Sequence, residues 1–123
     1  MSEIRATTIS DLVGTGPVTL TGQSAAKAWS NLNGTGTIAE RDSFNISGYV
    51  DNGTGDYTFT ISSDMSDANY AHSYGGHDDG YSLLTNNTAA APTAGALRTQ
   101  CFKSGFGLGD KDHLTAVIHG DLA

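Results

Sequence analysis

The fold is decided by residues 44–61, which read FNISGYVDNGTGDYTFTI in one-letter code. Residues 57–61 alternate aromatic or aliphatic side chains with threonine, and this period of two is typical of a strand with one buried face. The run over 44–50 is also β-prone, and the Asn52-Gly53 pair between the two runs tolerates positive φ. The stretch therefore predicts an antiparallel β-hairpin.

The same alternation continues on both sides of the hairpin. In residues 27–33 the even positions share one face, and in residues 113–119 the positions of Leu114, Ala116 and Ile118 point inward. Turn signals separate these runs at close spacing, so we expect about seven or eight short strands in an all-β antiparallel sandwich. The remaining strands are expected over residues 4–9, 17–21, 70–74, 81–85 and 97–104.

Two acidic residues interrupt the apolar spacing that leads into the hairpin. We therefore expect a bend or bulge over residues 41–43, which splits this region into two strands. The parity of the apolar positions predicts that Ile38, Phe44, Ile46 and Val50 face one side together.

The composition predicts a thin hydrophobic core. Gly, Ser, Thr and Asn together make up 50 of the 123 residues, whereas Ile, Leu, Val and Phe make up only 23. Five tyrosines and Trp29 add apolar surface. A chain of this size that buries little surface often gains stability by association, so we expect a homo-oligomer.

The chain divides into two expected parts. Residues 1–26 carry little core material and are expected to form an extended N-terminal arm that attaches to partners, whereas residues 27–123 form the β-sandwich. Five apolar side chains are the candidates for contacts with other copies or other proteins: Ile4, Ile9, Val18, Leu20 and Trp29.

The charge balance excludes several classes of partner. The net charge is −7, so nucleic acid and anionic membranes are poor partners. The single cysteine, Cys101, allows no internal disulfide. The start of the chain lacks the apolar region of a secretory signal, and no apolar run is long enough for a membrane span. We expect a soluble protein without membrane insertion.

Two separated motifs carry a family resemblance. Residues 26–39 read AKAWSNLNGTGTIA, and residues 41–58 contain the DNGTGDYT hairpin; together with MSDANY at residues 65–70 they resemble a module of tailed-phage virion proteins of the tail-fibre type. The opening residues 4–14 and the apolar strand at residues 114–120 are similar to the same module. Serine stands at position 66, where that module usually has proline.

The resemblance implies a structural component of a virion, made in the host cytoplasm. It implies a homotrimer that serves as a tail or head fibre, whose arm binds other virion proteins and whose sandwich contacts a host-surface glycan or protein. A capsid decoration protein is the alternative with the same fold. A small glycan hydrolase is a third possibility, and its carboxylates would come from Glu40, Asp42, Asp56, Asp64 and Asp67.

The richest cluster of functional groups surrounds the Gly-rich segment 75–80, which is expected to be a loop. Exposed aromatic and polar loops on a rigid β-scaffold are common recognition sites. The candidates for partner or receptor contact are His72, Tyr74, His77, Asp78, Asp79 and Tyr81.

The sequence otherwise predicts no catalytic residue, no cofactor and no metal. His113 and His119 face outward about 20 Å apart, too far to chelate one ion together, although three copies of one of them could meet at a threefold axis. The segment 110–112 is expected to be a solvated turn. Cys101 is expected to be a small buried residue rather than a nucleophile.

Overall fold

The computed structural model describes residues 22–77, 83–87, 89–105 and 107–123. These residues form eight strands in two antiparallel sheets, which confirms the predicted all-β sandwich. The strands are β1 (Ala28–Asn33), β2 (Ala39–Phe44), β3 (Ile46–Gly53), β4 (Asp56–Ile61), β5 (Ala71–His77), β6 (Leu83–Asn86), β7 (Ala96–Phe102) and β8 (His113–His119). Within the described ranges, no helix is long and apolar enough to span a membrane.

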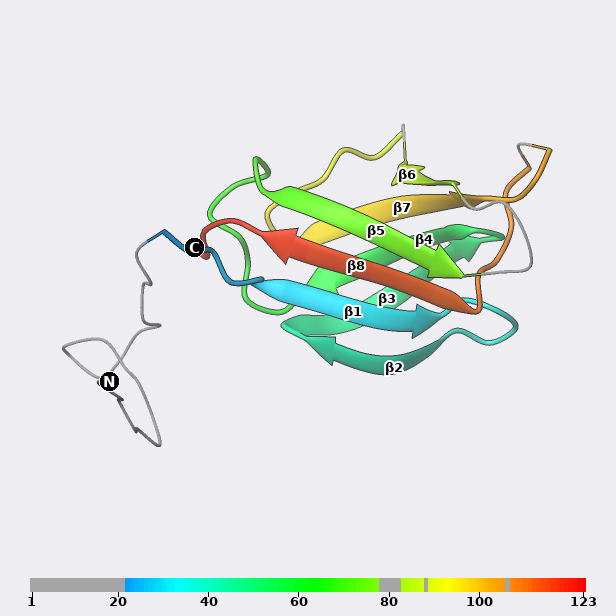
Figure 1. The fold of residues 1–123 in the computed structure, drawn as a ribbon, viewed down its shortest axis with the longest axis horizontal. Helices are drawn as coiled ribbons and strands as arrows, with labels where there is room; N and C mark the ends of the chain where they lie inside the picture. Colours follow the sequence, from blue (N-terminus) through cyan, green and yellow to red (C-terminus); the bar gives the residue numbers. More distant parts are fainter. Residues whose placement is uncertain (1–21, 78–82, 88, 106) are drawn as a thin grey trace, which may run out of the picture.

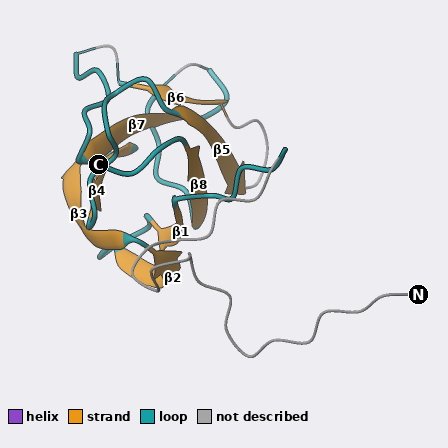
Figure 2. Cartoon of the chain, turned by 90° about the vertical axis from the view of Figure 1, so that its left-hand side faces the viewer, coloured by secondary structure: helices purple, strands orange, loops and turns teal. Residues whose placement is uncertain are grey.

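The two sheets have the strand orders β2-β1-β8-β5 and β3-β4-β7-β6. Figure 1 shows the first sheet in front of the second, with β1 and β8, the first and last strands, side by side at its centre. The chain passes from one sheet to the other between β2 and β3, between β4 and β5, between β5 and β6, and between β7 and β8. Figure 2 looks at the molecule from one end and shows the two curved sheets enclosing the core.

The predicted hairpin is formed by β3 and β4, joined by Thr54 and Gly55. On β4, Tyr57, Phe59 and Ile61 are buried, as the alternation predicted. The same alternation is confirmed on β1 and on β8, whose predicted inward residues are all buried. The hairpin and these two strands therefore supply most of the core.

The prediction that Ile38, Phe44, Ile46 and Val50 face the same side is wrong for Phe44 and Val50. The bulge expected at residues 41–43 is present, because Arg41 is skipped in the pairing of β1 with β2. It does not separate the two strands as expected, because β2 continues through it to Phe44 and β3 begins at Ile46. A second irregularity lies in β3. Ile46 pairs with Ile61 and Gly48 pairs with Thr60, so Ser47 is left out of the pairing. The Arg41 bulge reverses the parity of β2 and turns Phe44 outward, and the irregularity in β3 does the same for Val50. Their side chains are therefore 55% and 50% exposed.

Two predicted loops also differ from the structure. The segment 75–77 was expected to be a loop but continues β5 as far as His77, because β8 supplies backbone partners for it. Lys111, in the segment expected to be a solvated turn, is fully buried. Its carbonyl oxygen accepts a hydrogen bond from the backbone N–H of Gly34.

The buried core is small, as the composition predicted. Its twelve apolar members among the described residues come from both sheets and from the connection before β5, and three of them have short side chains. They are Ala28, Leu32, Tyr57, Phe59, Ile61, Met65, Tyr70, Leu97, Cys101, Leu114, Ala116 and Ile118.

Four tyrosines close this core by joining the two sheets through their hydroxyl groups. From the β3-β4-β7-β6 sheet, Tyr57 donates to the carbonyl of Gly34 at 2.8 Å, at the end of β1. Tyr49, on β3 of the same sheet, hydrogen-bonds Ser30 on β1 at 2.8 Å and donates to Glu40 on β2 at 2.7 Å. Both side chains therefore connect one sheet to the other.

The other two tyrosines make the same connection in the opposite direction. Tyr74, on β5, donates its hydroxyl to Oδ1 of Asn86 on β6 at 2.7 Å. Tyr70, just before β5, donates to the carbonyls of Thr93 and Ala96, at the start of β7, at 3.0 and 3.2 Å. Each buried hydroxyl therefore has a partner, which offsets the cost of removing it from water.

Burial has a measurable effect on these phenols. Desolvation raises the pKa of Tyr49 to about 12, with a smaller contribution from Glu40, and raises the pKa of Tyr70 to about 12. The pKa values of Tyr57 and Tyr74 are raised as well, again mainly by burial.

We predict that stability falls as the pH rises from 10 to 12. The folded protein holds these phenols neutral above the ordinary tyrosine pKa of 10, so their contribution is complete below pH 10 and is lost as the pH passes the folded value. Urea denaturation at several pH values should show the midpoint decreasing over this interval. Tyrosinate absorbance near pH 10 from more than one of the five tyrosines, while the protein is still folded, would contradict the assignment.

The loops around Tyr57 are packed too closely to accept a side chain at Gly55. This glycine has a φ of 65°, and a Cβ there would lie 2.6 Å from the backbone nitrogen of Gly109 and 2.7 Å from the carbonyl oxygen of Cys101. Gly36 has nearly the same φ, 64°, but its Cβ would meet nothing within 4 Å.

We predict that Gly55→Ala is more destabilising than Gly36→Ala. Both variants carry the cost of a left-handed backbone, about 1 to 2 kcal/mol, but only Gly55→Ala also forces backbone apart, for about another 1 to 3 kcal/mol. Urea denaturation of the two variants isolates the difference. Equal losses of stability would show that the loops are not tightly packed there.

Candidate functional site on the outer face of one sheet

The candidate site is the outer face of the β2-β1-β8-β5 sheet, which we call the outer β1–β8 face. It consists of the residues that alternate with the buried ones on β1, β5 and β8 and of their partners on β2. Its members are Trp29, Asn31, Asn33, Ala39, Asp42, Phe44, Ala71, Ser73, Gly75, His77, His113, Thr115, Val117 and His119.

An apolar row crosses the middle of this face. Trp29 pairs directly with Phe44 on β2 and with Val117 on β8, so the three side chains lie next to one another on the same side of the sheet. Phe44 is 55% exposed, and Trp29 and Val117 are partly exposed. Trp29 was predicted as a contact residue, whereas Phe44 was missed because the sequence placed it inside.

The outer β1–β8 face carries little charge. Among its members only Asp42 is an acid and none is Lys or Arg, although the chain has a net charge of −7. Arg41 lies in the bulge of β2, and the carboxylate of Asp112 lies at the end of the face beside His77 and His113. The side-chain oxygen Oδ1 of Asn31, on the same face, is buried without a hydrogen-bond partner. A face with little charge and with apolar side chains is suited to contact with a second surface.

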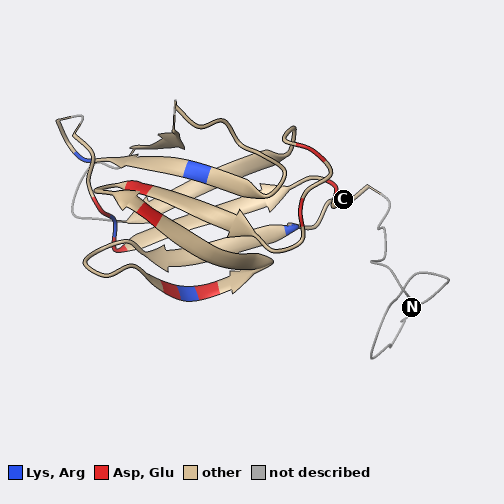
Figure 3. Cartoon of the chain, turned by 180° about the vertical axis from the view of Figure 1, so that it is seen from behind, with Lys and Arg blue, Asp and Glu red and all other residues tan. Residues whose placement is uncertain are grey.

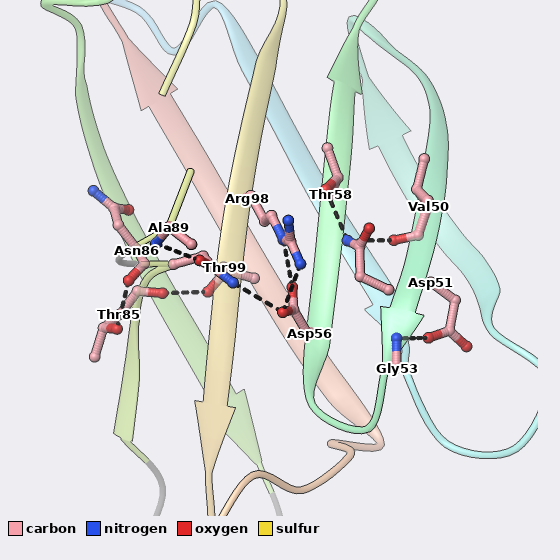
Figure 4. A network of polar contacts seen from close by, with 12 residues as sticks. Val50, Asp51, Gly53, Asp56, Thr58, Thr85, Asn86, Ala89, Arg98 and Thr99 are labelled. Atoms are coloured by element: carbon pink, nitrogen blue, oxygen red, sulfur yellow. Dashed lines mark hydrogen bonds and ion pairs between the residues drawn. The ribbon is translucent and has the colours of Figure 1, made fainter. Parts of the chain in front are cut away.

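The opposite sheet presents a more polar surface. Figure 3 shows the molecule from behind, with a basic position and acidic positions on the strands of this sheet. Asp56 is nearly buried there, and its carboxylate accepts two hydrogen bonds from Arg98, at 2.8 and 2.9 Å, and one from Asn87 at 2.8 Å (Figure 4). This arrangement occupies both oxygens of Asp56.

A second exposed apolar group lies at the far edge of that sheet. Leu83 pairs with Phe102, and Phe102 forms a bridge with Leu108. Leu83 and Leu108 are 38% and 41% exposed. This group adjoins segments outside the described residues, and it is the competing candidate for a contact surface.

A histidine cluster marks one end of the outer β1–β8 face. His77 and His113 are opposite each other on β5 and β8, with ring centroids 5.9 Å apart, and Asp112 lies beside both. An open cavity of about 470 Å³ adjoins the cluster and is lined by Gly75, Gly76, His77, His113 and Thr115. Partial desolvation raises the pKa of Asp112, but hydrogen bonds from His77 and His113 outweigh it and hold that pKa below its usual value.

The structure places the predicted contact residues in different environments. His77 is exposed, as expected of a contact residue. His72 and Tyr74 instead face inward, and the hydroxyl of Tyr74 and Nε2 of His72 both contact Oδ1 of Asn86, at 2.7 and 2.8 Å. They join β5 to β6 and have a structural role in this arrangement. The other candidates lie outside the described residues: Asp78, Asp79, Tyr81, Ile4, Ile9, Val18 and Leu20.

The structure gives Cys101 the environment of a core residue. It is fully buried on β7, and burial raises the pKa of its thiol to about 12. A thiol with this pKa has very little of the reactive thiolate at neutral pH. The expectation that Cys101 is a small buried residue agrees with this position.

Comparisons with protein-family models, with characterised proteins and with solved structures find no match to this chain. The functional argument therefore depends on the sequence and on the geometry described above.

Proposed function

We propose that this protein is a non-catalytic structural module that assembles with copies of itself through the outer β1–β8 face. The observation that carries the proposal is the apolar row of Phe44, Trp29 and Val117, in which Phe44 is exposed and the other two are partly exposed. The row lies on a face whose own strand positions include one acid, Asp42. Copies with a net charge of −7 repel one another, and the repulsion is smallest where the least charge is brought together. A second copy of the chain is therefore the occupant that this face fits best.

We further propose that the assembly belongs to the particle of a tailed phage, as a tail or head fibre that contacts the host surface. The resemblance of residues 26–70 to tail-fibre modules supports this location and favours three copies. The thin core supports it as well, because association buries surface that a single copy leaves in water. The N-terminal residues 1–26 would attach the module to other virion proteins.

The hydrolase alternative receives less support from the geometry. Asp56 is occupied by Arg98 and Asn87, and Glu40 accepts a hydrogen bond from Tyr49. Both carboxylates contribute to the fold, so neither is placed as a general acid or nucleophile in an open groove.

We predict that Phe44→Glu weakens self-association and that Val50→Glu does not. Both side chains are about half exposed, but Phe44 lies on the outer β1–β8 face and Val50 lies on the outer face of the other sheet. A buried, unpaired carboxylate costs about 3 kcal/mol, which corresponds to a roughly hundredfold weaker association. Sedimentation velocity over a range of concentrations measures this change.

Leu108→Glu serves as a further comparison in the same experiment. Dissociation caused by Leu108→Glu or Val50→Glu, with Phe44→Glu unaffected, would place the interface on the other sheet. A wild-type chain that stays monomeric at every concentration would overturn the proposal altogether. Circular dichroism of each variant establishes that the fold is retained.

We predict that a fibre and a decoration protein differ in the number of copies on each particle. They also differ in whether added protein competes with the phage for binding to its host. Labelled protein on intact particles, viewed by electron microscopy, should appear in few copies at the tail or at sparse positions on the head if the chain is a fibre. Excess purified protein should then also reduce adsorption of the phage to its host. Many copies over the whole head, with unchanged adsorption, would favour the decoration protein.

A further inference from the structure

The pairing of β5 with β8 places two imidazoles on one side of the sheet. His77 and His113 are direct cross-strand partners, and both side chains are directed outward. Opposite residues of antiparallel strands have Cβ atoms about 5 Å apart, so the two rings can reach a common point. Their planes are nearly perpendicular, at 87°.

Asp112 adds a carboxylate between the two histidines. Nδ1 of His77 lies 3.4 Å from Oδ1 of Asp112, and Nδ1 of His113 lies 3.5 Å from Oδ2. One ligand atom from each of the three residues lies within 4.8 Å of the other two. Two ligands about 2.1 Å from a tetrahedral ion are roughly 3.4 Å apart, so a small closing of the side chains would produce this geometry.

The surroundings of the cluster leave room for a bound ion and for one more ligand. The side chains of His77, Asp112 and His113 are 78%, 45% and 46% exposed, so they can adjust without disturbing the core. The cavity beside them is bordered by Gly75, which has no side chain to block it. A fourth ligand, such as water or a carboxylate of another molecule, can approach from this side.

We propose that His77, Asp112 and His113 of one chain bind a divalent transition-metal ion. Two imidazoles and one carboxylate suit Zn²⁺ and the neighbouring ions Ni²⁺ and Cu²⁺, whereas Mg²⁺ and Ca²⁺ prefer all-oxygen ligands. The proposal does not depend on the function proposed above, because the three ligands come from a single chain. It also differs from a site on a threefold axis, which needs one histidine from each copy.

The test is titration of the untagged full-length protein with ZnCl₂ by isothermal titration calorimetry. We expect one ion per chain in the wild type, and binding at least about tenfold weaker in His77→Ala, in His113→Ala and in Asp112→Ala, since the loss of even an outer partner of a ligand costs tenfold or more. His119→Ala is the matched control, because His119 is outward on the same strand but about 20 Å from His113. It should bind like the wild type.

Three results would overturn the proposal. The first is a wild type that binds no Zn²⁺, and the second is an affinity that His77→Ala leaves unchanged. The third is a stoichiometry of one ion per three chains, which would indicate a shared site on an axis. CaCl₂ and MgCl₂ give the comparison for cation selectivity and should produce no binding heat at this site. Circular dichroism of each variant separates loss of a ligand from loss of the fold.

Discussion

The structure depends on four tyrosine hydroxyls that connect two sheets across a thin core. Among the described residues, the core has only twelve apolar members, including two alanines and a cysteine, and such a core buries limited apolar area. Tyr49, Tyr57, Tyr70 and Tyr74 each place a large ring in the gap and hydrogen-bond the sheet or loop on the other side. Each ring contributes apolar burial, and each hydroxyl fixes the position of an element that would otherwise be held weakly.

This arrangement explains why the outer surfaces differ. Phenols and close-packed glycine loops join the two sheets from the inside, so the outer β1–β8 face is not needed to hold one sheet to the other. That face carries an exposed Phe44 and a partly exposed Trp29, which is unfavourable in water and which contact with another surface would relieve. Stability and proposed function are thus divided between the two sides of the same sheet.

Part of this fold could be predicted from local pattern. The alternation in residues 57–61 and 113–119 identified the hairpin and the last strand, because a period of two needs no knowledge of the partner strand. Val50 was misplaced because an unpaired residue in β3 reverses the parity and no local signal marked that bulge. Phe44 was misplaced although the bulge near Arg41 was expected, because its effect on the parity of β2 was not followed through. Gly75 and Gly76 were predicted to lie in a loop, because glycine has no side chain that could show the alternation of a strand. Their pairing with β8 makes them part of β5.

The candidate site was less predictable for the same reason. His77 was identified, but its neighbours His113 and Asp112 are 35 or more residues away in the sequence, and only the β5–β8 register brings them together. The outer β1–β8 face likewise depends on which strands are neighbours. A crystal structure of the full chain tests the account most directly: we expect copies that meet through this face, with Phe44 and Trp29 buried between them. Copies that meet through β6 and β7, with Phe44 left in solvent, would contradict it.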